Sequence, residues 1–588
     1  MKILRREQGG QDSISGTLGQ PAANVVDETL SDLPPLLRRV LLARGIADRA
    51  EVDHSLSALA PPSKLKGIDS AVALLIDVLE RKGRVVVVGD FDVDGASSCA
   101  VAVRTLEAMG FPAVRFLVPN RFEYGYGLTP DIVELAAPMH PDLLITVDNG
   151  ISSVEGVAAA NALNIPVLVT DHHLPGDTLP DAAAIVNPNQ PGCDFPSKAL
   201  AGVGVMFYLA MALRSELRQR GWFAKSAIAE PNLAEYLDLV ALGTVADVVP
   251  LDHNNRVLVE QGLRRIRSGR SCIGIRAILD VAGCNAANLT ATDLGFVLGP
   301  RLNAAGRLDD MSLGVACLLA SDPSIAHGLA EQLDTMNRDR RSIESGMQAQ
   351  ADTALQRLQL DSGAVPTAIA LYDESWHQGV VGIVASRVKE CYHRPVICFA
   401  KEGDRGETLK GSARSITGFH IRDALDRIAS TCPGLVDKFG GHAMAAGLSI
   451  NASRLDEFAA AFDNVASDWL RPDQLESVIL SDGELPAEDM TLANAALLES
   501  AMPWGQHFSE PQFDDTFELL QQRVLVEKHL KMVLRKGDNV LDAIAFNIDR
   551  EIWPNTTVET VRLVYQLSVN RYRGRENLQL IVRYLEPA

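Results

Sequence analysis

The sequence predicts an α/β protein with a doubly wound parallel sheet, a long connecting helix, a second α/β domain and a small C-terminal β-barrel. Three observations support this fold class. Apolar runs alternate with helical segments from about residue 70, one helical pattern continues over about residues 322–358, and closely spaced β runs fill the stretch after about residue 475. A chain of 588 residues is long enough for several such domains.

The first half of the chain alternates helical segments with short runs rich in Val, Ile and Leu. We expect helices over 70–82, 96–109 and 152–164, and strands at RVVVVGD, AVRFLVP, DLLITVD, IPVLVTD and AAAIVNP. Because these runs are apolar without alternation, they indicate strands that are covered on both faces. The first thirty or so residues are rich in Gly, Gln and Ser, and we expect them to form a loose tail.

The sequence of the second half of the chain predicts a long helix, a second lobe and a barrel. Asp322 as a cap and Pro323 in the first turn favour the start of the long helix, which would join two lobes across a cleft. A strand, a loop and a helix from about Val380 follow, and five closely spaced β runs end the chain. The expected boundaries are 1–40 for the tail and lead-in, 41–320 for the first domain, 321–360 for the helix, 361–470 for the second domain and 471–588 for the barrel.

Composition narrows the class of protein only slightly. Hydrophobic residues make up 47% and charged residues 22%, as in ordinary soluble proteins. The formal net charge of −20 argues against coating nucleic acid through bulk positive charge, but it allows a local basic groove. The eight cysteines form no CxxC pair, and no signal peptide or transmembrane run is apparent, so we expect a cytoplasmic protein without membrane contact.

Acidic residues and histidines follow three of the predicted strands, in RVVVVGDFDVD, DLLITVDNG and IPVLVTDHH. In open α/β sheets the ligand site lies outside the carboxyl ends of the strands, so these groups should meet at one edge. Asp90, Asp92 and Asp94 occupy alternate positions, which an extended segment would direct to one face. Asp247 follows an apolar helical segment and plausibly provides a fourth side of the same ligand site.

Such crowded carboxylates repel one another, and a divalent cation offsets the repulsion. An Asp after a strand can instead serve as a turn former or helix cap, and for Asp94 alone that alternative is favoured. For the whole set a metal site is the better interpretation. Oxygen ligands with one imidazole suit Mn²⁺ or Mg²⁺, and of the two adjacent histidines one can bind metal while its neighbour faces the substrate.

Several motifs resemble those of a known family. GDFDVDGASS, VDNGIS, TDHHLP, NPNQP and GTVADVVPL occur in this order and resemble the DHH phosphoesterase superfamily. GPRLNAAGRLDD, WHQGVVGIVASR, KGSARS and KFGGHAMAAG resemble the RecJ family within it. The resemblance covers about residues 70–588 and implies a DHH catalytic domain, a DHHA1-type substrate-binding domain and a C-terminal OB-like domain.

The resemblance also implies roles for individual residues. Two Mn²⁺ or Mg²⁺ ions would be held by Asp92, Asp94, Asp148, His172 and Asp247, with Asp148 as the bridge. Asp90 would bind an ion directly or support a ligand. His173 would contact the scissile phosphate and complete, with Asp148 and Asp90, the catalytic set.

Substrate contacts are expected from both lobes. The first lobe would supply Arg301, Asn303 and Arg307, and the second His377, Ser412, Arg414, Gly441 and His442. Without the family, pairing of the arginines with acids such as Asp309 is equally plausible. Ser412 and Arg414, with Arg121 of the first lobe, would line a pocket for a terminal 5′-phosphate. Four aromatic side chains of the barrel could stack on bases or belong to its core: Phe546, Tyr565, Tyr572 and Tyr584.

The function implied by the resemblance is hydrolysis of single-stranded DNA from the 5′ end by a two-metal exonuclease with a role in repair and recombination. Single-stranded DNA is the expected partner, with single-strand-binding protein or a helicase as further candidates. One alternative is a DHH phosphodiesterase acting on short oligonucleotides or cyclic dinucleotides, which would not need a C-terminal barrel. Another is a non-catalytic DNA-binding scaffold, which would have lost some of the ligand positions.

Overall fold

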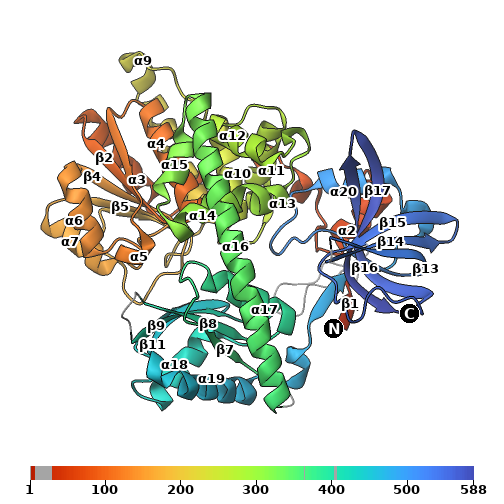
Figure 1. Cartoon of the computed structure of the whole chain (residues 1–588). Coiled ribbons are helices and arrows are strands. Elements are labelled where there is room, and N and C mark those ends of the chain that lie inside the picture. Colours follow the sequence, from red (N-terminus) through yellow and green to blue (C-terminus); the bar gives the residue numbers. More distant parts are fainter. Residues whose placement is uncertain (1, 7–29, 363–364, 403–406, 527) are drawn as a thin grey trace. The chain divides into compact units, whose positions relative to one another are not determined.

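The computed structural model of the chain describes residues 2–6, 30–362, 365–402, 407–526 and 528–588 (Figure 1). These residues divide into two compact units. One contains Leu4–Asp334 and Leu480–Ala588, and the other contains Thr335–Ile479 and the start of the chain. The first unit therefore holds both the predicted catalytic domain and the predicted barrel.

The predicted catalytic domain is built on a parallel five-stranded sheet with the order β3-β2-β4-β5-β6, as the apolar runs indicated. The strands are β2 (Arg84–Gly89), β3 (Ala113–Leu117), β4 (Leu143–Val147), β5 (Val167–Thr170) and β6 (Ala184–Val186). The chain moves from β2 outward to β3 and then returns to the other side of β2 with β4. This reversal creates a crevice at the carboxyl ends of β2 and β4, where ligands bind in such sheets.

Helices cover both faces of this sheet. Alternate strand residues such as Val86 and Val88 pack against α6 (Pro130–Ala136) and α7 (Val154–Ala162). The opposite face contacts α3 (Ile68–Glu80), α4 (Val93–Ala108) and α8 (Gly202–Gln219). Since every residue of β4 and β5 is buried, the sheet has no solvated face there, which explains the unalternated apolar runs.

A helical region completes the catalytic domain. It includes α10 (Leu237–Ala246), α11 (His253–Arg267), α12 (Ile273–Ala282), a π-helical turn at Leu294–Leu298, α14 (Gly299–Leu308) and α15 (Ser312–Leu319). The long helix α16 (Pro323–Ser362) follows, and Asp322 accepts hydrogen bonds from the backbone N–H groups of Ser324 and Ile325. The predicted cap and helix are therefore confirmed.

The second unit contains a mixed sheet with the order β10-β11-β9-β8-β7. Its strands are β7 (Ile369–Tyr372), β8 (Val396–Lys401), β9 (Thr408–Arg414), β10 (Lys438–Gly441) and β11 (Ala445–Asn451), and only β7 and β8 are parallel. One face packs on α17 (Val381–Tyr392) and the later part of α16. The other face packs on α18 (Ile421–Thr431) and α19 (Leu455–Trp469).

The C-terminal strands close into the expected barrel, with the order β13-β14-β15-β17-β16. They are β13 (Phe513–Leu525), β14 (His529–Lys536), β15 (Asn539–Ala545), β16 (Thr560–Tyr572) and β17 (Arg575–Pro587). Three strands have 13 residues, so the expectation of five short strands is wrong. The preceding helix α20 (Leu492–Ala501) is Ala- and Leu-rich and capped by Thr491, a helical signal inside a stretch interpreted as β.

The prediction that the first thirty or so residues form a loose tail is wrong for the start of the chain. Lys2–Arg5 form β1, which pairs with β12 (Val478–Ser481). The Arg5 guanidinium also binds the buried carboxylate of Asp514 at 2.8 Å. Arg5 thus shares this buried acid of the barrel with Arg562, which lies 3.3 Å from the same carboxylate. Residues 7–29 lie outside the described part of the chain.

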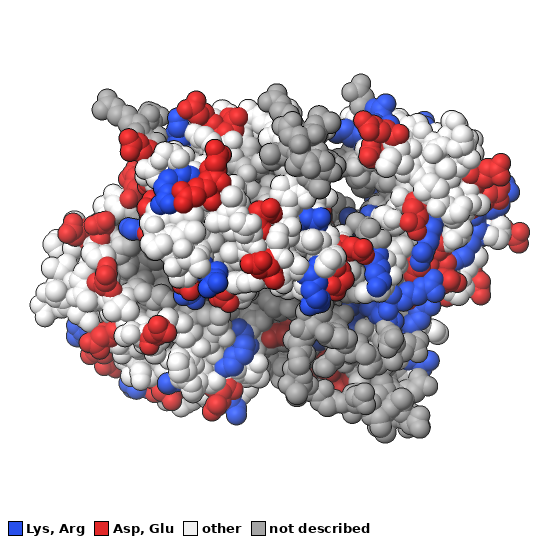
Figure 2. Space-filling view, turned by 90° about the horizontal axis from the view of Figure 1, so that it is seen from below, with Lys and Arg blue, Asp and Glu red and all other residues white. Residues whose placement is uncertain are grey.

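The surface carries both signs of charge. Figure 2 shows acidic and basic side chains interspersed over the face that it draws, with a larger group of basic side chains at the right of the view. A net charge of −20 is thus compatible with a local basic area. Among the described residues, no helix, including the 40-residue α16, has an apolar stretch long enough to cross a bilayer.

Candidate metal centre

The predicted metal ligands meet at the carboxyl end of the parallel sheet. Asp90 and Asp92 follow β2, Asp148 follows β4, and the two histidines follow β5. Their ligand atoms lie within 4.8 Å of one another in three groups: Asp90, Asp92 and Asp148; Asp148, His172 and His173; and Asp94, His172 and Asp247. Asp148 and His172 each belong to two groups, so the three groups form one continuous centre.

The three alternate aspartates do not lie in one extended segment, contrary to expectation. Helix α4 already begins at Val93, and Asp92 is its N-cap, accepting a hydrogen bond from the Gly95 N–H at 3.0 Å. Asp94 therefore lies in the first helical turn. A Cβ on Gly95 would approach the Asp90 carbonyl oxygen to 2.4 Å, so glycine allows the helix to start directly against the end of β2.

Asp94 is held by the start of another helix. Its two carboxylate oxygens accept hydrogen bonds from the backbone N–H groups of Gly202 and Val203 at 2.7 and 2.9 Å, at the N-terminus of α8. Burial and the neighbouring Asp92 carboxylate nevertheless raise the pKa of Asp94 to about 7. Gly243 of α10 leaves room for this carboxylate, since a Cβ there would lie 2.8 Å from Asp94 Oδ1.

Asp148 occupies a strained position. Its φ of 62° is left-handed, which is uncommon for a residue other than glycine. A Cβ on Gly202 would lie only 2.7 Å from the Asp148 Cβ, so the first residue of α8 must be small. Burial and the surrounding acids, with Asp94 the largest contributor among them, raise the pKa of Asp148 well above its usual range.

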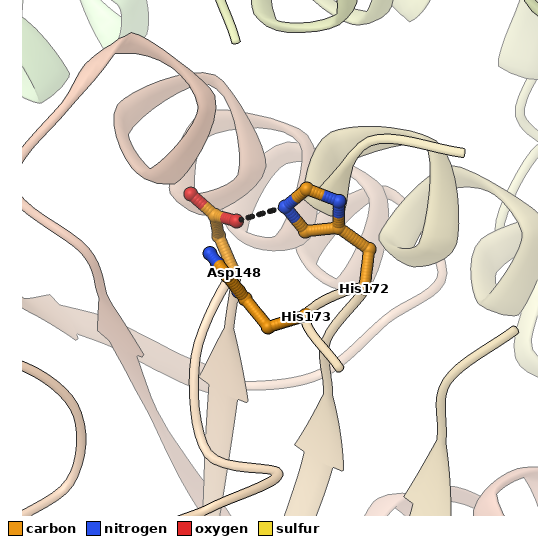
Figure 3. A group of neighbouring side chains, drawn as sticks. All are labelled: Asp148, His172 and His173. Carbon is orange, nitrogen blue, oxygen red and sulfur yellow. Dashed lines mark ion pairs between the residues drawn. The ribbon is translucent and has the colours of Figure 1, made fainter. Parts of the chain in front are cut away.

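His172 lies between two of these carboxylates. Its Nε2 is 3.1 Å from Asp148 Oδ1, as the dashed line in Figure 3 marks, and 3.4 Å from Asp247 Oδ2. Both carboxylate oxygens are shielded from solvent, and no described residue donates a hydrogen bond to either. Buried acceptors without donors are costly, and a cation coordinated by carboxylate and imidazole would satisfy them. The residues present therefore fit a divalent metal.

His173 is oriented by Asp171, a residue that was not among the predicted site residues. Asp171 accepts hydrogen bonds from the backbone N–H groups of both histidines and lies 2.7 Å from His173 Nδ1. Burial alone would lower the pKa of His173, but the hydrogen bond and the charges of Asp171, Asp90 and Asp92 raise it. The hydroxyl of Tyr126 lies 3.1 Å from the same Nδ1.

The NPNQP motif supports the histidine pair from β6. Asn187 donates a hydrogen bond to the His173 carbonyl at 3.0 Å, and Asn189 donates to the His172 carbonyl at 2.5 Å. Sequence reasoning assigned these asparagines no role. Their position directly after the next parallel strand was the signal that could have identified them.

The GPRLNAAGR motif contacts the same centre from α14. Asn303 accepts a hydrogen bond from the Val93 N–H at 3.2 Å, and a Cβ on Gly306 would approach the Phe91 carbonyl to 1.9 Å. Arg301 forms an ion pair with Asp334 at 2.9 Å. This agrees with the alternative that the arginines of the motif pair with acids of the chain, although the partner is not Asp309. Arg307 is half-buried in the last turn of the helix, and its phosphate contact stays a prediction.

In the second unit, Ser412 and Arg414 lie on β9 beside the start of α17. Arg414 donates a hydrogen bond to the Ser412 hydroxyl at 3.1 Å, and a Cβ on Gly382 would lie 2.9 Å from the guanidinium. His377 accepts a hydrogen bond from the Gly379 N–H, just before the same helix. The side chain of Arg121 lies outside the described part.

Gly441 ends β10 and His442 follows it, two strands away from β9, which carries Ser412 and Arg414. Gly441 is paired with Ala446 of β11, and Ala446 is paired with Ala413 of β9. His442 is exposed, and its N–H donates a hydrogen bond to the Ala445 carbonyl. Ser412, Arg414 and Gly441 thus come from the sheet, and His377 and His442 from segments beside it, but the roles of all five stay predictions.

The fold and the carboxylate–imidazole centre define a phosphoesterase of the DHH class. The DHH family, N-terminal domain, matches residues 84–244, the DHHA1 domain matches 365–468, and the RecJ OB domain matches 481–584. By these domains and by the similarity of its full-length relatives, the chain belongs to the RecJ family.

Two relatives show how far the similarity extends. Single-stranded-DNA-specific exonuclease RecJ of Dickeya dadantii is 55% identical over 95% of this chain and 97% of its own length. The Escherichia coli protein of the same name is 52% identical over 96% of this chain and 98% of its own length.

A solved structure agrees with this assignment. RecJ of Thermus thermophilus in complex with Mn²⁺ superposes with a TM-score of 0.77 at 30% identity, covering 100% of this chain and 79% of that one. The same protein in complex with Mg²⁺ gives a TM-score of 0.72 at 28% identity, covering 99% and 78%.

Proposed function

We propose that the chain is a metal-dependent exonuclease that hydrolyses phosphodiester bonds of single-stranded DNA in the 5′-to-3′ direction. The observation that carries this proposal is the pair of buried, unsatisfied oxygens on Asp148 and Asp247 around His172. They support a cation site in a chain about half identical to single-stranded-DNA-specific exonucleases over nearly its full length. Mn²⁺ or Mg²⁺ is the proposed cofactor, as two ions.

When bound, the two ions would supply a hydroxide nucleophile at neutral pH and offset the charge of the phosphate. The proposed ligands are Asp92, Asp94, Asp148, His172 and Asp247. Asp148 is the proposed bridge because it is shared between two of the three ligand groups and, unlike the imidazole of His172, has two acceptor oxygens. Asp90 belongs to one of these groups, which supports a role either as a direct ligand of an ion or as a residue that holds a ligand in place.

His173 is proposed to contact the scissile phosphate. Asp171 holds one ring nitrogen at 2.7 Å and favours the protonated imidazole, as the raised pKa of His173 indicates. A protonated ring would donate a hydrogen bond to a phosphate oxygen and stabilise the charge that develops during displacement. Asp171 is then a positioning residue, since it acts through the histidine.

The function is tested by digestion of single-stranded DNA labelled at its 5′ or 3′ end, with Mn²⁺, and with a short oligoribonucleotide for comparison. We expect the wild type to release nucleotides from the 5′ end of DNA and Asp148→Ala to be inactive at every Mn²⁺ concentration, because the shared carboxylate is lost. Preferential cleavage of the oligoribonucleotide would favour the small-substrate phosphodiesterase. Inactivity of the wild type on both substrates would favour a scaffold.

We also propose that Arg414 binds the terminal 5′-phosphate. Its guanidinium lies beside Ser412 and the start of α17, which brings a positive charge, a hydroxyl and a helix N-terminus together at one place. A terminal monoester carries about one more negative charge than an internal diester near neutral pH, because its second pKa is about 6. A guanidinium at this position would therefore favour chain ends.

Arg414→Ala is expected to reduce the preference for 5′-phosphorylated over 5′-hydroxyl DNA by roughly tenfold or more, while Mn²⁺ affinity is unchanged. The measurement is kcat/KM for both substrates. Arg387→Ala is a matched control, because Arg387 is an exposed arginine of the same unit that pairs with Glu344 and Glu390. An equal preference ratio in wild type and Arg414→Ala would exclude this role.

Finally, we propose a cytoplasmic location, a role in DNA repair and recombination, and single-strand-binding protein or a helicase as partners. These proposals rest on the family alone. A partner would be tested by co-purification with the full-length chain in the presence of nuclease, so that a shared DNA strand cannot connect the two proteins.

A further inference from the structure

Val248 is an unfavourable residue for the position that it occupies. It follows Asp247, the C-cap of α10, and has a left-handed φ of 59°. Glycine or asparagine usually takes this place after a helix, and a β-branched side chain there is strained. The side chain is also 61% exposed, so burial does not compensate for the strain. The stability of the folded chain therefore gives no reason for a valine here.

A second exposed aliphatic side chain lies in a neighbouring segment of the centre. Leu174 follows His173 directly and is also 61% exposed. The segments that carry Leu174 and Val248 meet where His172 Nε2 lies 3.4 Å from Asp247 Oδ2. We call Leu174 and Val248 the apolar lip. Both residues lie within two positions of that contact, whereas the centre itself contains carboxylates and imidazoles.

We propose that the apolar lip contacts the nucleoside attached to the phosphate that enters the centre. This inference rests on the proposed function and assigns a nucleoside subsite to it. The carboxylates and imidazoles suit ions and a phosphate, but they offer nothing to the apolar surface of a base or a deoxyribose. An enzyme that degrades strands of any sequence needs contacts that every nucleotide can make, and apolar contacts meet this requirement better than hydrogen bonds to base edges.

Binding of product-like probes separates this contact from catalysis. Calorimetry in the presence of Mn²⁺ would compare inorganic phosphate, deoxyribose 5-phosphate and thymidine 5′-monophosphate for the wild type, Val248→Gly and Leu174→Ala. We expect Val248→Gly to weaken binding of thymidine 5′-monophosphate by roughly three- to tenfold and to leave the affinities for phosphate and Mn²⁺ unchanged. Leu174→Ala should show the same pattern. A loss shared by deoxyribose 5-phosphate would assign the contact to the sugar, and its absence would assign it to the base.

The chain offers a matched control for Val248→Gly. Val526, at the end of the first barrel strand, is also a left-handed valine, with a φ of 47°, and is 84% exposed. Val526→Gly makes the same chemical change outside the metal centre and should leave all three affinities unchanged. Glycine tolerates the left-handed region, so neither substitution should lower Tm through backbone strain.

Unchanged binding of thymidine 5′-monophosphate in Val248→Gly would overturn the proposal. Equal losses for phosphate and the nucleotide, or a loss of Mn²⁺ affinity, would also overturn it, because Val248 would then act by positioning Asp247. Failure of the proposed function looks different. A wild type that does not cleave single-stranded DNA, yet loses nucleotide affinity in Val248→Gly, would refute the exonuclease assignment and retain the apolar lip.

Discussion

Asp94 and Asp148, which are buried, form a cluster with the partly buried Asp247, and the fold disfavours ionisation of all three carboxyls. Burial is the largest cause of the raised pKa of each, and the charges of the other acids add to it. In the metal-free protein these carboxyls are most stable when protonated, whereas a divalent ion favours their charged forms. Metal binding and stability should therefore both depend on pH.

Without metal, the stability of the folded chain should depend on pH through the carboxyl of Asp94. The pKa of Asp94 rises from 3.8 in its ordinary state to about 7 in the fold, so between these values the folded chain binds more protons than the unfolded chain. Its contribution is complete below about pH 4 and is lost as the pH rises through about 7. We expect Tm in chelator to fall as the pH rises from about 4 through about 7, and Mn²⁺ to reverse most of the fall.

Asp94→Asn provides the control, because an amide does not ionise and keeps a similar shape. Its metal-free Tm should depend less on pH over the same range, and its response to Mn²⁺ should be weaker. Parallel pH profiles for wild type and Asp94→Asn would contradict the contribution of this carboxyl.

The two histidines should differ when each is removed. His172 lies within 3.1–3.4 Å of two carboxylate oxygens, whereas His173 is held by Asp171. His172→Ala is expected to weaken Mn²⁺ binding by about tenfold or more, and His173→Ala to lower kcat while changing Mn²⁺ affinity little. Calorimetry and single-turnover rates measure the two effects. Asp171→Asn should resemble His173→Ala in its lower kcat, and equal losses of Mn²⁺ affinity in both histidine variants would refute the division of roles.

At the scale of elements, the centre depends on how closely helices approach the strand ends. Gly95 permits α4 to start against Asp90, Gly202 permits α8 to start against Asp148, and Gly243 permits α10 to pass Asp94. The helix starts also supply backbone donors, as α8 does for Asp94. These three glycines, of which only Gly202 lies outside the acidic motifs, thus determine where the carboxylates can lie.

Gly202→Ala tests this dependence. The added methyl would lie 2.7 Å from both the Cβ and Oδ1 of Asp148, which forces the carboxylate or the helix to move. We expect a loss of Mn²⁺ affinity of at least tenfold and a destabilisation of about 1–3 kcal/mol. Gly328→Ala of α16 is the control, since nothing lies within 4 Å of its Cβ position, and it should be neutral or slightly stabilising. Normal Mn²⁺ binding by Gly202→Ala would contradict the packing argument.

The same scale explains what sequence reasoning could predict. The parallel sheet and the convergence of its acids follow from local patterns, since strand-end residues meet wherever strands are parallel. The start of α4 was not predicted, because alternation in DFDVDG is equally compatible with a strand and with a capped helix. The roles of Asn187 and Gly202 depend on contacts between distant segments, which no local pattern specifies.

At the scale of the molecule, the barrel is less separate from the catalytic domain than its sequence suggested. The Leu251 N–H donates a hydrogen bond to the Gln506 carbonyl, and Thr292 donates one to Glu510. A cavity of about 550 Å³ lies between them, lined by residues such as Asp293, Glu499 and Arg571. Cutting the chain near residue 470 would therefore remove these contacts with the catalytic domain as well as the barrel.

Point substitutions test the barrel better than truncation. Of the four aromatic residues proposed for stacking, Tyr565 is buried and donates a hydrogen bond to Asp515, and Tyr584 donates one to Glu586. Phe546 and Tyr572 are 50% and 62% exposed. Of the four residues, these last two expose the most ring surface to bases.

We therefore expect Phe546→Ala and Tyr572→Ala each to weaken binding of long single-stranded DNA by roughly fivefold or more, since stacking on one base is worth about 1–3 kcal/mol. Hydrolysis of a trinucleotide should be unaffected, because these side chains do not contribute to the metal centre. Tyr565→Phe is the matched control: it removes the hydroxyl bonded to Asp515 and should lower Tm without changing DNA affinity. Titrations with a long strand at several salt concentrations, beside kcat/KM on the trinucleotide, provide the measurements. If neither alanine variant lost affinity for the long strand, stacking on these rings would be excluded. Any contribution of the barrel to DNA binding would then come from charge, and the affinities of both variants would fall with salt as steeply as that of the wild type.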